Sequence, residues 1–151
     1  MAATATTNWT EHTTRALAEA GYRSSAPREE VIDAISELGC SITAREIADL
    51  LRERGSGVGL ASIYRALDLL DRLGLVKRFD VGEGVARYEA ALPGGDHHHH
   101  LVCDSCGTVE PFEDDRLEEA IHGLSGKTEF AVAAHDVTLH GECPACRAGD
   151  G

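Results

Sequence analysis

The sequence has no long apolar run and no recognisable leader. No stretch approaches the roughly 20 consecutive apolar residues that a helix needs to span a bilayer. The first residues, MAATATTNWT, lack the basic and then apolar order of a secretory signal. These absences predict a cytoplasmic protein without a membrane partner.

Positive charge is also scarce, which argues at first against a nucleic-acid partner. Lys and Arg number 14 against 26 Asp and Glu, a net charge of −12, whereas phosphate binding normally leaves a basic surface. The charge is unevenly placed: residues 1–90 carry 11 basic and 14 acidic residues (net −3), and residues 91–151 carry 3 and 12 (net −9). The first half therefore stays compatible with DNA, and bound metal cations would offset part of the acid in the second.

Length and hydrophobic content allow two small domains. With 151 residues and 42% hydrophobic residues, the chain can form one sizeable core or two small ones. The patterns described below favour an α+β protein. They predict a winged-helix DNA-binding domain at residues 8–90, a hinge at 91–96, and a small α/β metal-binding domain at 97–148, for which the resemblance described at the end of this section also implies dimerisation.

Apolar periodicity in the first half predicts four helices. After a frayed tail of ten residues, helices are expected at residues 10–20, from Pro27 to about residue 38, from Thr43 to about residue 54, and at residues 61–73. Thr43 and Glu46 have the spacing of a capping box. Residues 75–80 and 85–90 flank a Gly-Glu-Gly turn and predict the β-hairpin of a wing.

The fourth helix is the expected DNA reader. A helix-turn-helix protein places the N-terminal part of its second helix in the major groove, and here that part carries Ser62, Tyr64 and Arg65. Arg23 and Arg28 are further candidates for phosphate or groove contacts. The alternative is a three-helix domain that binds another protein, with these arginines as ordinary surface residues.

Two Cys-x-x-Cys pairs dominate the second half. Cys103, Cys106, Cys143 and Cys146 supply the four thiolates of a closed tetrahedral zinc site. Since no position is left for a substrate water, this Zn²⁺ would be structural and part of the folding free energy of a small domain. The alternative, a redox dithiol, lacks the βαβ pattern that usually surrounds one.

Four consecutive histidines precede the first cysteine pair. In an extended chain, His97 and His99 face one side while His98 and His100 face the other, so one run can contribute to two metal sites. The partners must come from elsewhere, and the candidates are Glu89, Glu118 and His135. The alternative is a solvated polar loop, and His12, His122 and His140 are assigned no ligand role.

An enzyme is not expected. The sequence has no His-Glu-x-x-His. His140-Gly141-Glu142 resembles part of a deaminase motif, but it directly abuts Cys143 and no Pro-Cys-x-x-Cys follows it.

Several segments together resemble the ferric uptake regulator (Fur) family, which includes iron, zinc, nickel, manganese and peroxide sensors. They are AGYRSSAPRE, GVGLASIYRALDLLDRLGLV, GEGVARYEA, HHHHLVCDSCG and AAHDVTLHGECPAC, in family order and spacing. The resemblance implies a homodimer held by its C-terminal domains. It also implies a repressor that binds double-stranded DNA at an AT-rich palindromic operator when a regulatory metal is bound.

The resemblance also implies roles for individual residues. The four cysteines named above would hold structural Zn²⁺. A sensing site at the hinge would take Glu89, His98 and His100, and a second site would take His97, His99, Glu118 and His135. Arg23 matches a minor-groove residue, and Tyr64 and Arg65 match recognition-helix contacts.

The chain departs from both the iron-sensing and the zinc-sensing (Zur) patterns. Where iron sensors have a histidine in the DNA-binding domain, this chain has Gly39-Cys40-Ser41-Ile42. Where zinc sensors have a cysteine shortly before the histidine run, it has Leu92-Pro93-Gly94-Gly95. Our hypothesis is that Cys40 replaces the missing ligand, which favours Zn²⁺ over Fe²⁺ because thiolate is a soft donor. Glu110 is another possible ligand.

Two alternative functions stay open at this point. A peroxide sensor of the same family would oxidise a histidine ligand, but such sensors tend to have aspartate where this chain has Glu89. A metal-storage or metal-delivery protein would keep the His and Cys clusters but would not need Tyr64 and Arg65 on a winged helix.

Overall fold

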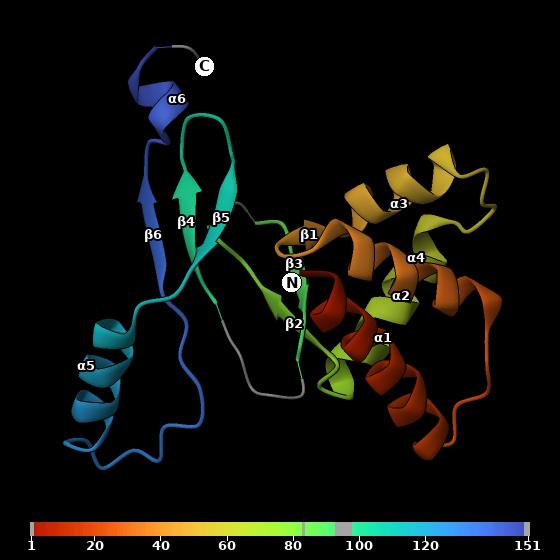
Figure 1. The fold of residues 1–151 in the computed structure, drawn as a ribbon, viewed down its shortest axis with the longest axis horizontal. Coiled ribbons are helices and arrows are strands. Elements are labelled where there is room, and N and C mark those ends of the chain that lie inside the picture. Colours follow the sequence, from red (N-terminus) through yellow and green to blue (C-terminus); the bar gives the residue numbers. More distant parts are fainter. Residues whose placement is uncertain (1, 83, 93–97, 150–151) are drawn as a thin grey trace. The chain divides into compact units, whose positions relative to one another are not determined.

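The computed structural model describes residues 2–82, 84–92 and 98–149 (Figure 1). The chain divides into two compact units, unit 1 at Met1–Asp96 and unit 2 at His97–Gly151. Most of the expected hinge, residues 93–96, and His97 lie outside the described residues. Both units combine helices with a sheet, in agreement with the predicted α+β class.

Unit 1 contains four helices and a small sheet. In chain order these are α1 (Ala2–Glu19), α2 (Ala26–Leu38), β1 (Ile42–Thr43), α3 (Ala44–Glu53), α4 (Leu60–Arg72), β2 (Val76–Phe79) and β3 (Arg87–Ala90). All four predicted helices are present. The prediction of a frayed tail is wrong, because α1 begins at Ala2. Trp9 is buried in the core and its indole N–H donates to the Leu75 carbonyl at 2.8 Å, which anchors α1.

Local chemistry explains where α3 and α4 begin and end. The Thr43 hydroxyl accepts from the Glu46 N–H at 3.2 Å, and the Glu46 carboxylate accepts from the Thr43 N–H at 2.7 Å, so the predicted capping box is confirmed. After α4, Gly74 adopts φ 69°, a left-handed conformation that suits glycine at the end of a helix.

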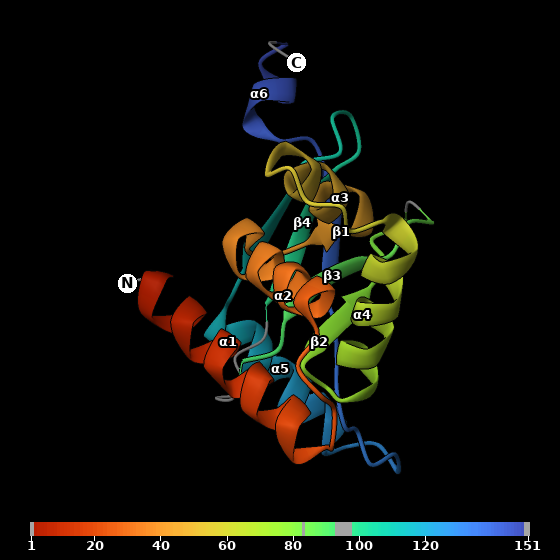
Figure 2. The same ribbon diagram turned by 90° about the vertical axis from the view of Figure 1, so that its right-hand side faces the viewer.

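The core of unit 1 is an apolar cluster shared by its helices. Ile35, Ile47, Ile63, Leu67 and Leu70 are fully or almost fully buried. Helices α2 and α3 both pack against α4 (Figure 2). This packing buries one side of α4 in the core and leaves its other side exposed to solvent.

The wing is confirmed as an antiparallel hairpin. Strand order in the sheet is β1-β3-β2, with Lys77 opposite Glu89 and Ile42 opposite Tyr88. The short strand β1 was not predicted, because two residues carry no periodic signal. Its pairing makes β3, which carries Glu89, the central strand.

Unit 2 contains a three-stranded sheet, one longer helix and one short helix. The elements are β4 (His99–Cys103), β5 (Val109–Phe112), α5 (Asp115–Ser125), β6 (Thr138–Gly141) and α6 (Pro144–Arg147). Strand order is β5-β4-β6, with β4 antiparallel to β5 and parallel to β6. The parallel pair requires a crossover connection, and α5 lies within it.

The predicted β-rich run at residues 130–140 is mostly irregular. Only Thr138–Gly141 forms a strand, and pairing with β4 starts where His100 lies opposite Thr138. Upstream, the Thr128 hydroxyl caps a turn by accepting from the Phe130 N–H at 3.3 Å. An apolar run alone does not make a strand when no partner strand lies beside it.

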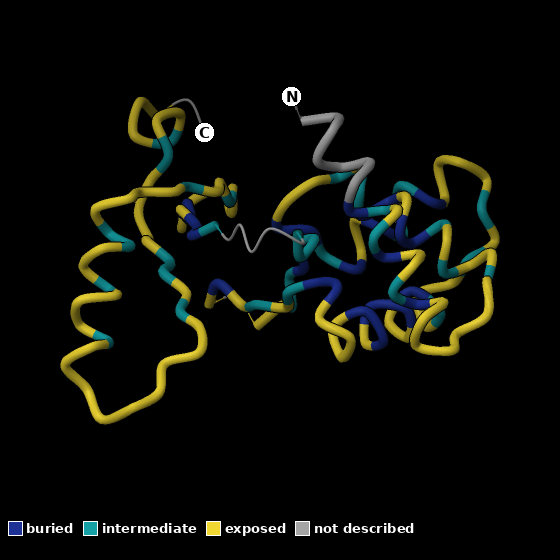
Figure 3. The backbone as a smooth tube through the Cα atoms, turned by 60° about the horizontal axis from the view of Figure 1, so that its bottom comes forward, coloured by how far each residue is buried: buried dark blue, intermediate teal, exposed yellow. Residues whose placement is uncertain are grey.

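Unit 2 buries little apolar surface. Its buried hydrophobic residues are Val102 and Cys103, and α5 has none. Figure 3 shows this helix and the loop that follows it as mostly exposed. In the part of the chain that the structure describes, no helix is both long and apolar enough to cross a membrane.

Candidate metal centres and DNA-reading helix

The four paired cysteines meet at one end of the unit 2 sheet. Cys103 ends β4 and Cys106 follows in the turn to β5, whereas Cys143 directly precedes α6 and Cys146 lies within it. The parallel pairing places Cys103 opposite Gly141, which brings the second pair beside the first. Residues about 40 positions apart thus share one site.

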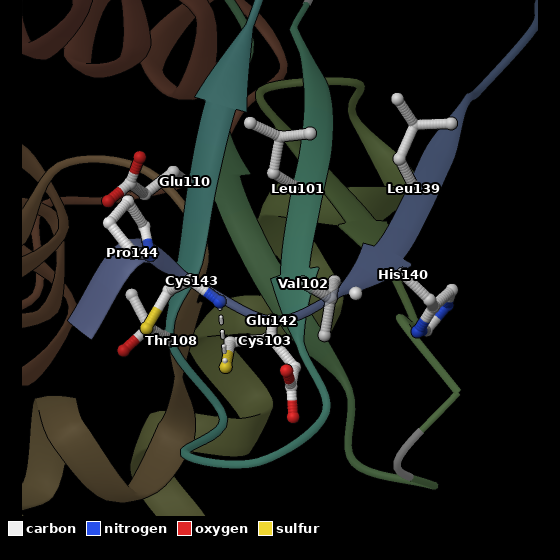
Figure 4. Close-up of a pocket in the computed structure, with 11 residues that line it drawn as sticks. Leu101, Val102, Cys103, Thr108, Glu110, Leu139, His140, Glu142, Cys143 and Pro144 are labelled. Atoms are coloured by element: carbon white, nitrogen blue, oxygen red, sulfur yellow. Dashed lines mark hydrogen bonds between the residues drawn. The ribbon is translucent and has the colours of Figure 1, made fainter. Parts of the chain in front are cut away.

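The sulfur geometry fits a tetrahedral metal ion. All four Sγ atoms lie within 4.8 Å of one another, and Cys106 Sγ is 3.8 Å from Cys143 Sγ. Sulfurs each about 2.3 Å from a tetrahedral zinc ion would be about 3.8 Å apart. The Cys143 N–H donates to Cys103 Sγ at 3.3 Å, shown by the dashed line in Figure 4.

The protonation of these thiols explains why a cation would stabilise the cluster. Donation from the backbone of Cys143, and then of Cys106, lowers the pKa of Cys103 to about 6. The neighbouring thiols, Cys143 first, raise the pKa of Cys146 to about 12. Four thiolates this close repel one another, so a divalent cation that binds all four supplies the missing compensation.

A second ligand group in unit 2 joins β4, α5 and the loop before β6. One oxygen of the Glu118 carboxylate lies 2.5 Å from His99 Nε2, and the other lies 2.9 Å from His135 Nε2. His99 is almost fully buried. Two imidazoles and one carboxylate are a donor set suited to zinc, iron, nickel or manganese. The structure therefore brings together three of the four residues expected at the second site; the fourth, His97, lies outside the described residues.

The neighbours of His99 in the histidine run have different surroundings. His98 Nε2 lies 3.2 Å from the Glu113 carboxylate. His100 is buried in β4, on the face of the strand opposite to that of His99.

In unit 1, Cys40 and Glu89 lie side by side. Cys40 follows α2, and Glu89 is only 4% exposed on β3. The thiol sulfur and a carboxylate oxygen are within 4.8 Å of each other. Desolvation, and then the negative charge of Glu89, raises the pKa of Cys40. A buried carboxylate beside a thiol is a pair that a soft divalent cation would stabilise.

Glu110 lies apart from these groups. It is opposite Leu101 in the β4–β5 pair and Leu139 is opposite Leu101 on the other side. The three side chains line an open cleft of about 190 Å³ on one face of the sheet (Figure 4). Glu110 belongs to none of the ligand groups formed by the described residues.

The candidate DNA-reading residues occupy the outward side of α4. Tyr64 is 46% exposed, and Ile63 beside it is fully buried. Arg65 is exposed and its Nη2 donates to the Ser62 hydroxyl at 3.3 Å. This side of the helix can meet a partner without disturbing the core.

Arg23 and Arg28 lie together at the connection between α1 and α2. Arg28 Nη1 donates to the Arg23 carbonyl at 3.0 Å, and its guanidinium lies 5.7 Å from the centre of the Tyr22 ring. The Arg28 side chain is thereby ordered, and the Arg23 side chain is exposed.

Sequence reasoning missed two contacts around these groups. Glu113, the partner of His98, follows β5, and the antiparallel register that brings it close is not visible in the sequence. Arg87 Nη1 donates to the Ser41 carbonyl at 3.0 Å and so fastens the turn that carries Cys40. Ser41 has φ 57°, unusual for a residue other than glycine.

Comparisons with known proteins agree on one family. A family model described as ferric uptake regulator family matches residues 19–140. The ferric uptake regulation protein of Bacillus subtilis is 34% identical over 132 residues, 86% of this chain and 89% of that protein.

Two solved structures extend the likeness. The ferric uptake regulator of Vibrio cholerae matches with a TM-score of 0.76 and 32% identity, over 85% of this chain and 98% of that one. A zinc uptake regulator complexed with zinc and DNA matches with a TM-score of 0.63 and 27% identity, over 96% and 97%.

Proposed function

Because the chain belongs to the ferric uptake regulator family, we propose that it is a metal-dependent repressor that binds double-stranded DNA and controls metal-uptake or metal-homeostasis genes. Proteins of this family are transcription regulators and not enzymes. The observation that carries the proposal is the outward side of α4, where Tyr64 and Arg65 stand clear of the core. A metal-storage protein would have no use for such a helix.

The proposed DNA contacts follow from that helix. Ser62, Tyr64 and Arg65 would enter the major groove, and Arg23 and Arg28 would contact phosphates or the adjacent minor groove. The related zinc regulator was solved with DNA, which supports a duplex as the partner. An AT-rich palindromic operator fits a homodimer, because a two-fold protein matches a two-fold site.

The homodimer would form through unit 2. Phe130 is 83% exposed and Leu124 is 65% exposed, and Leu101, Val132 and Leu139 are also exposed. Among its described residues, unit 2 buries two hydrophobic side chains and exposes these five large ones, so it gains from covering them. We propose that a second copy of the chain covers them, as the family resemblance implies.

Three metal roles are proposed. The four-cysteine cluster would hold structural Zn²⁺. His99, Glu118 and His135, with His97, would form a second site. Cys40 and Glu89, with His98 and His100 added on the strength of the family resemblance, would sense the regulatory metal.

The sensing site is proposed to act by linking the domains. A ligand shifts a conformational equilibrium only by its different affinity for the two states. Ligands from both domains converge in one domain arrangement, so metal binding would favour that arrangement. The four-cysteine site, contained in one unit, has no such difference. With a thiolate donor at Cys40, Zn²⁺ is favoured over Fe²⁺ as the co-repressor.

The test is DNA binding by protein that keeps its structural zinc but has lost its regulatory metal. The duplex is DNA from its own promoter region, titrated at fixed salt with buffered Zn²⁺ and, anaerobically, with Fe²⁺. We expect binding to appear at the lower free concentration with Zn²⁺. DNA binding in the absence of both metals would contradict the proposal. So would a failure to bind DNA in the presence of either metal.

Variants separate the ligand assignments. Glu89→Gln and His98→Ala should abolish the metal response while the protein stays folded, and Glu110→Gln is the matched carboxylate control. If Cys40→Ser keeps the full Zn²⁺ response, Cys40 is not a ligand. A response to Fe²⁺ alone would make the protein an iron regulator.

A further inference from the structure

Two clefts in unit 1 border α4. One, here called the α3 cleft, has a volume of about 280 Å³ and is lined by Arg45 and Arg52 of α3, the turn 56–59 and Leu60. The other, here called the α2 cleft, has a volume of about 270 Å³ and includes Ser25, Arg28, Ser62 and Arg65 in its lining. Both clefts open to solvent beside the helix proposed to read DNA.

Both clefts are lined by basic side chains, although the chain as a whole is acidic. The whole sequence carries −12, yet each cleft is lined by two arginines, and no Asp or Glu lines either one among the described residues. The cleft on the unit 2 sheet, in contrast, includes Glu110 and Glu142. Two arginines around a hollow without a carboxylate form a site for an anion.

The arginines keep donors available for such an anion. Each guanidinium has five N–H donors. Arg65 uses one on Ser62 and Arg28 uses one on the Arg23 carbonyl. Arg45 makes no hydrogen bond or ion pair within the described chain.

Arg52 pairs with Asp49 one turn away, at 3.1 Å. Both of these side chains are largely exposed. An exposed ion pair of this kind is weak and can be exchanged for a phosphate.

The clefts lie on opposite sides of α4. At about 100° per residue, Leu60 in the α3 cleft is about 160–200° around the helix from Ser62 and Leu69 in the α2 cleft. The outward side of the helix, marked by Tyr64, lies between them. An α-helix with its side chains is about 10–12 Å across and the major groove is about 12 Å wide, so an inserted helix has a DNA strand on each side.

We propose that the two clefts each bind a backbone phosphate, one on each of the two DNA strands that border the major groove. Arg45 and Arg52 hold one strand, and Arg28 holds the other, at the edge of the groove that Arg65 enters. The inference rests on the proposed DNA-binding function and adds α3, which the sequence patterns did not nominate. It also explains how an acidic protein binds a polyanion, because the described lining of each cleft holds two arginines and no carboxylate.

The experiment compares single Arg→Gln variants in the metal-loaded full chain. Arg45→Gln tests the α3 cleft and Arg28→Gln tests the α2 cleft. Arg54→Gln is the matched control, because Arg54 follows the same helix as Arg45 but pairs with Glu37 and lines neither cleft. The probe is a duplex selected from random sequence by the metal-loaded wild type.

The first readout is the salt dependence of the DNA dissociation constant. Each lost phosphate contact should reduce the slope of log K against log salt by about 0.9, hence by about 1.8 for a dimer. Arg54→Gln should keep the wild-type slope. Trp9 fluorescence and circular dichroism verify that each variant is folded.

The second readout is phosphate ethylation interference, which distinguishes the clefts. Arg45→Gln should lose interference on one strand of the contacted groove, and Arg28→Gln should lose it on the other. Wild-type slopes and patterns in both variants would overturn the inference while the proposed function stands. Failure of the wild type to bind any duplex would overturn both.

Discussion

Replacing one thiolate of the four-cysteine cluster should unfold unit 2 and leave unit 1 intact. In Cys103→Ser the cluster loses the ligand that ends β4 and accepts from the Cys143 N–H. Structural zinc is worth about 10–16 kcal/mol of apparent folding free energy in comparable peptides. Burial of a valine such as Val102, one of the two buried hydrophobic residues of unit 2, contributes about 1.5–3 kcal/mol. Even a partial loss of the zinc-binding free energy therefore exceeds the free energy that burial of these apolar residues contributes.

The chain offers a built-in assay for this prediction. Trp9 is the only tryptophan and is buried in unit 1, so its fluorescence reports on that unit alone. We expect Cys103→Ser to lose the circular dichroism of α5, to lose bound zinc and to become sensitive to protease after residue 97, with unchanged Trp9 emission. Cys40→Ser, the same substitution in unit 1, is the control and should keep unit 2 folded. Dispersed amide signals from unit 2 in zinc-free Cys103→Ser would refute the reasoning.

Three smaller perturbations test other parts of the fold and site. Leu67→Ala removes a fully buried side chain from the core of unit 1, so urea unfolding followed by Trp9 fluorescence should show a loss of about 2–5 kcal/mol; a loss below 1 kcal/mol would contradict the packing. Thr43→Ala deletes the cap that accepts from Glu46 and should cost about 1 kcal/mol in the same assay. Glu118→Gln weakens the donor set shared with two histidines, so elemental analysis should show loss of the second-site metal while the four-cysteine zinc is retained; unchanged metal content would argue against that site.

Features of unit 1 that depend on neighbours in sequence could be predicted. The capping box at Thr43, the glycine after α4 and the hairpin of β2 and β3 each depend on residues a few positions apart. Strand β1 could not be predicted, because its two residues become a strand only through pairing with β3. The start of α1 depends likewise on Trp9 reaching Leu75, which is far along the chain.

The candidate metal ligands likewise divide into those that are visible in the local sequence and those that depend on the pairing of distant segments. Two Cys-x-x-Cys pairs are visible in the sequence, because each pair is a local turn. That they meet depends on the parallel pairing of β4 with β6, which no spacing reveals. Glu118 and His135 were candidates from the sequence, but only the resemblance to a family joined them with His99 in one site. Glu113 was not named at all, since the register of β4 and β5 brings it to His98.

Net charge illustrates the limit of composition as evidence. A shortage of basic residues counts against a DNA partner only if the charge is spread evenly over the protein. The fold instead places Arg28, Arg45, Arg52 and Arg65 around two hollows beside α4 and leaves carboxylates out of their described linings. Since the Debye length at physiological ionic strength is about 8 Å, a phosphate in either cleft responds mainly to these nearby guanidinium groups. A protein of net charge −12 can therefore still carry a DNA-binding surface.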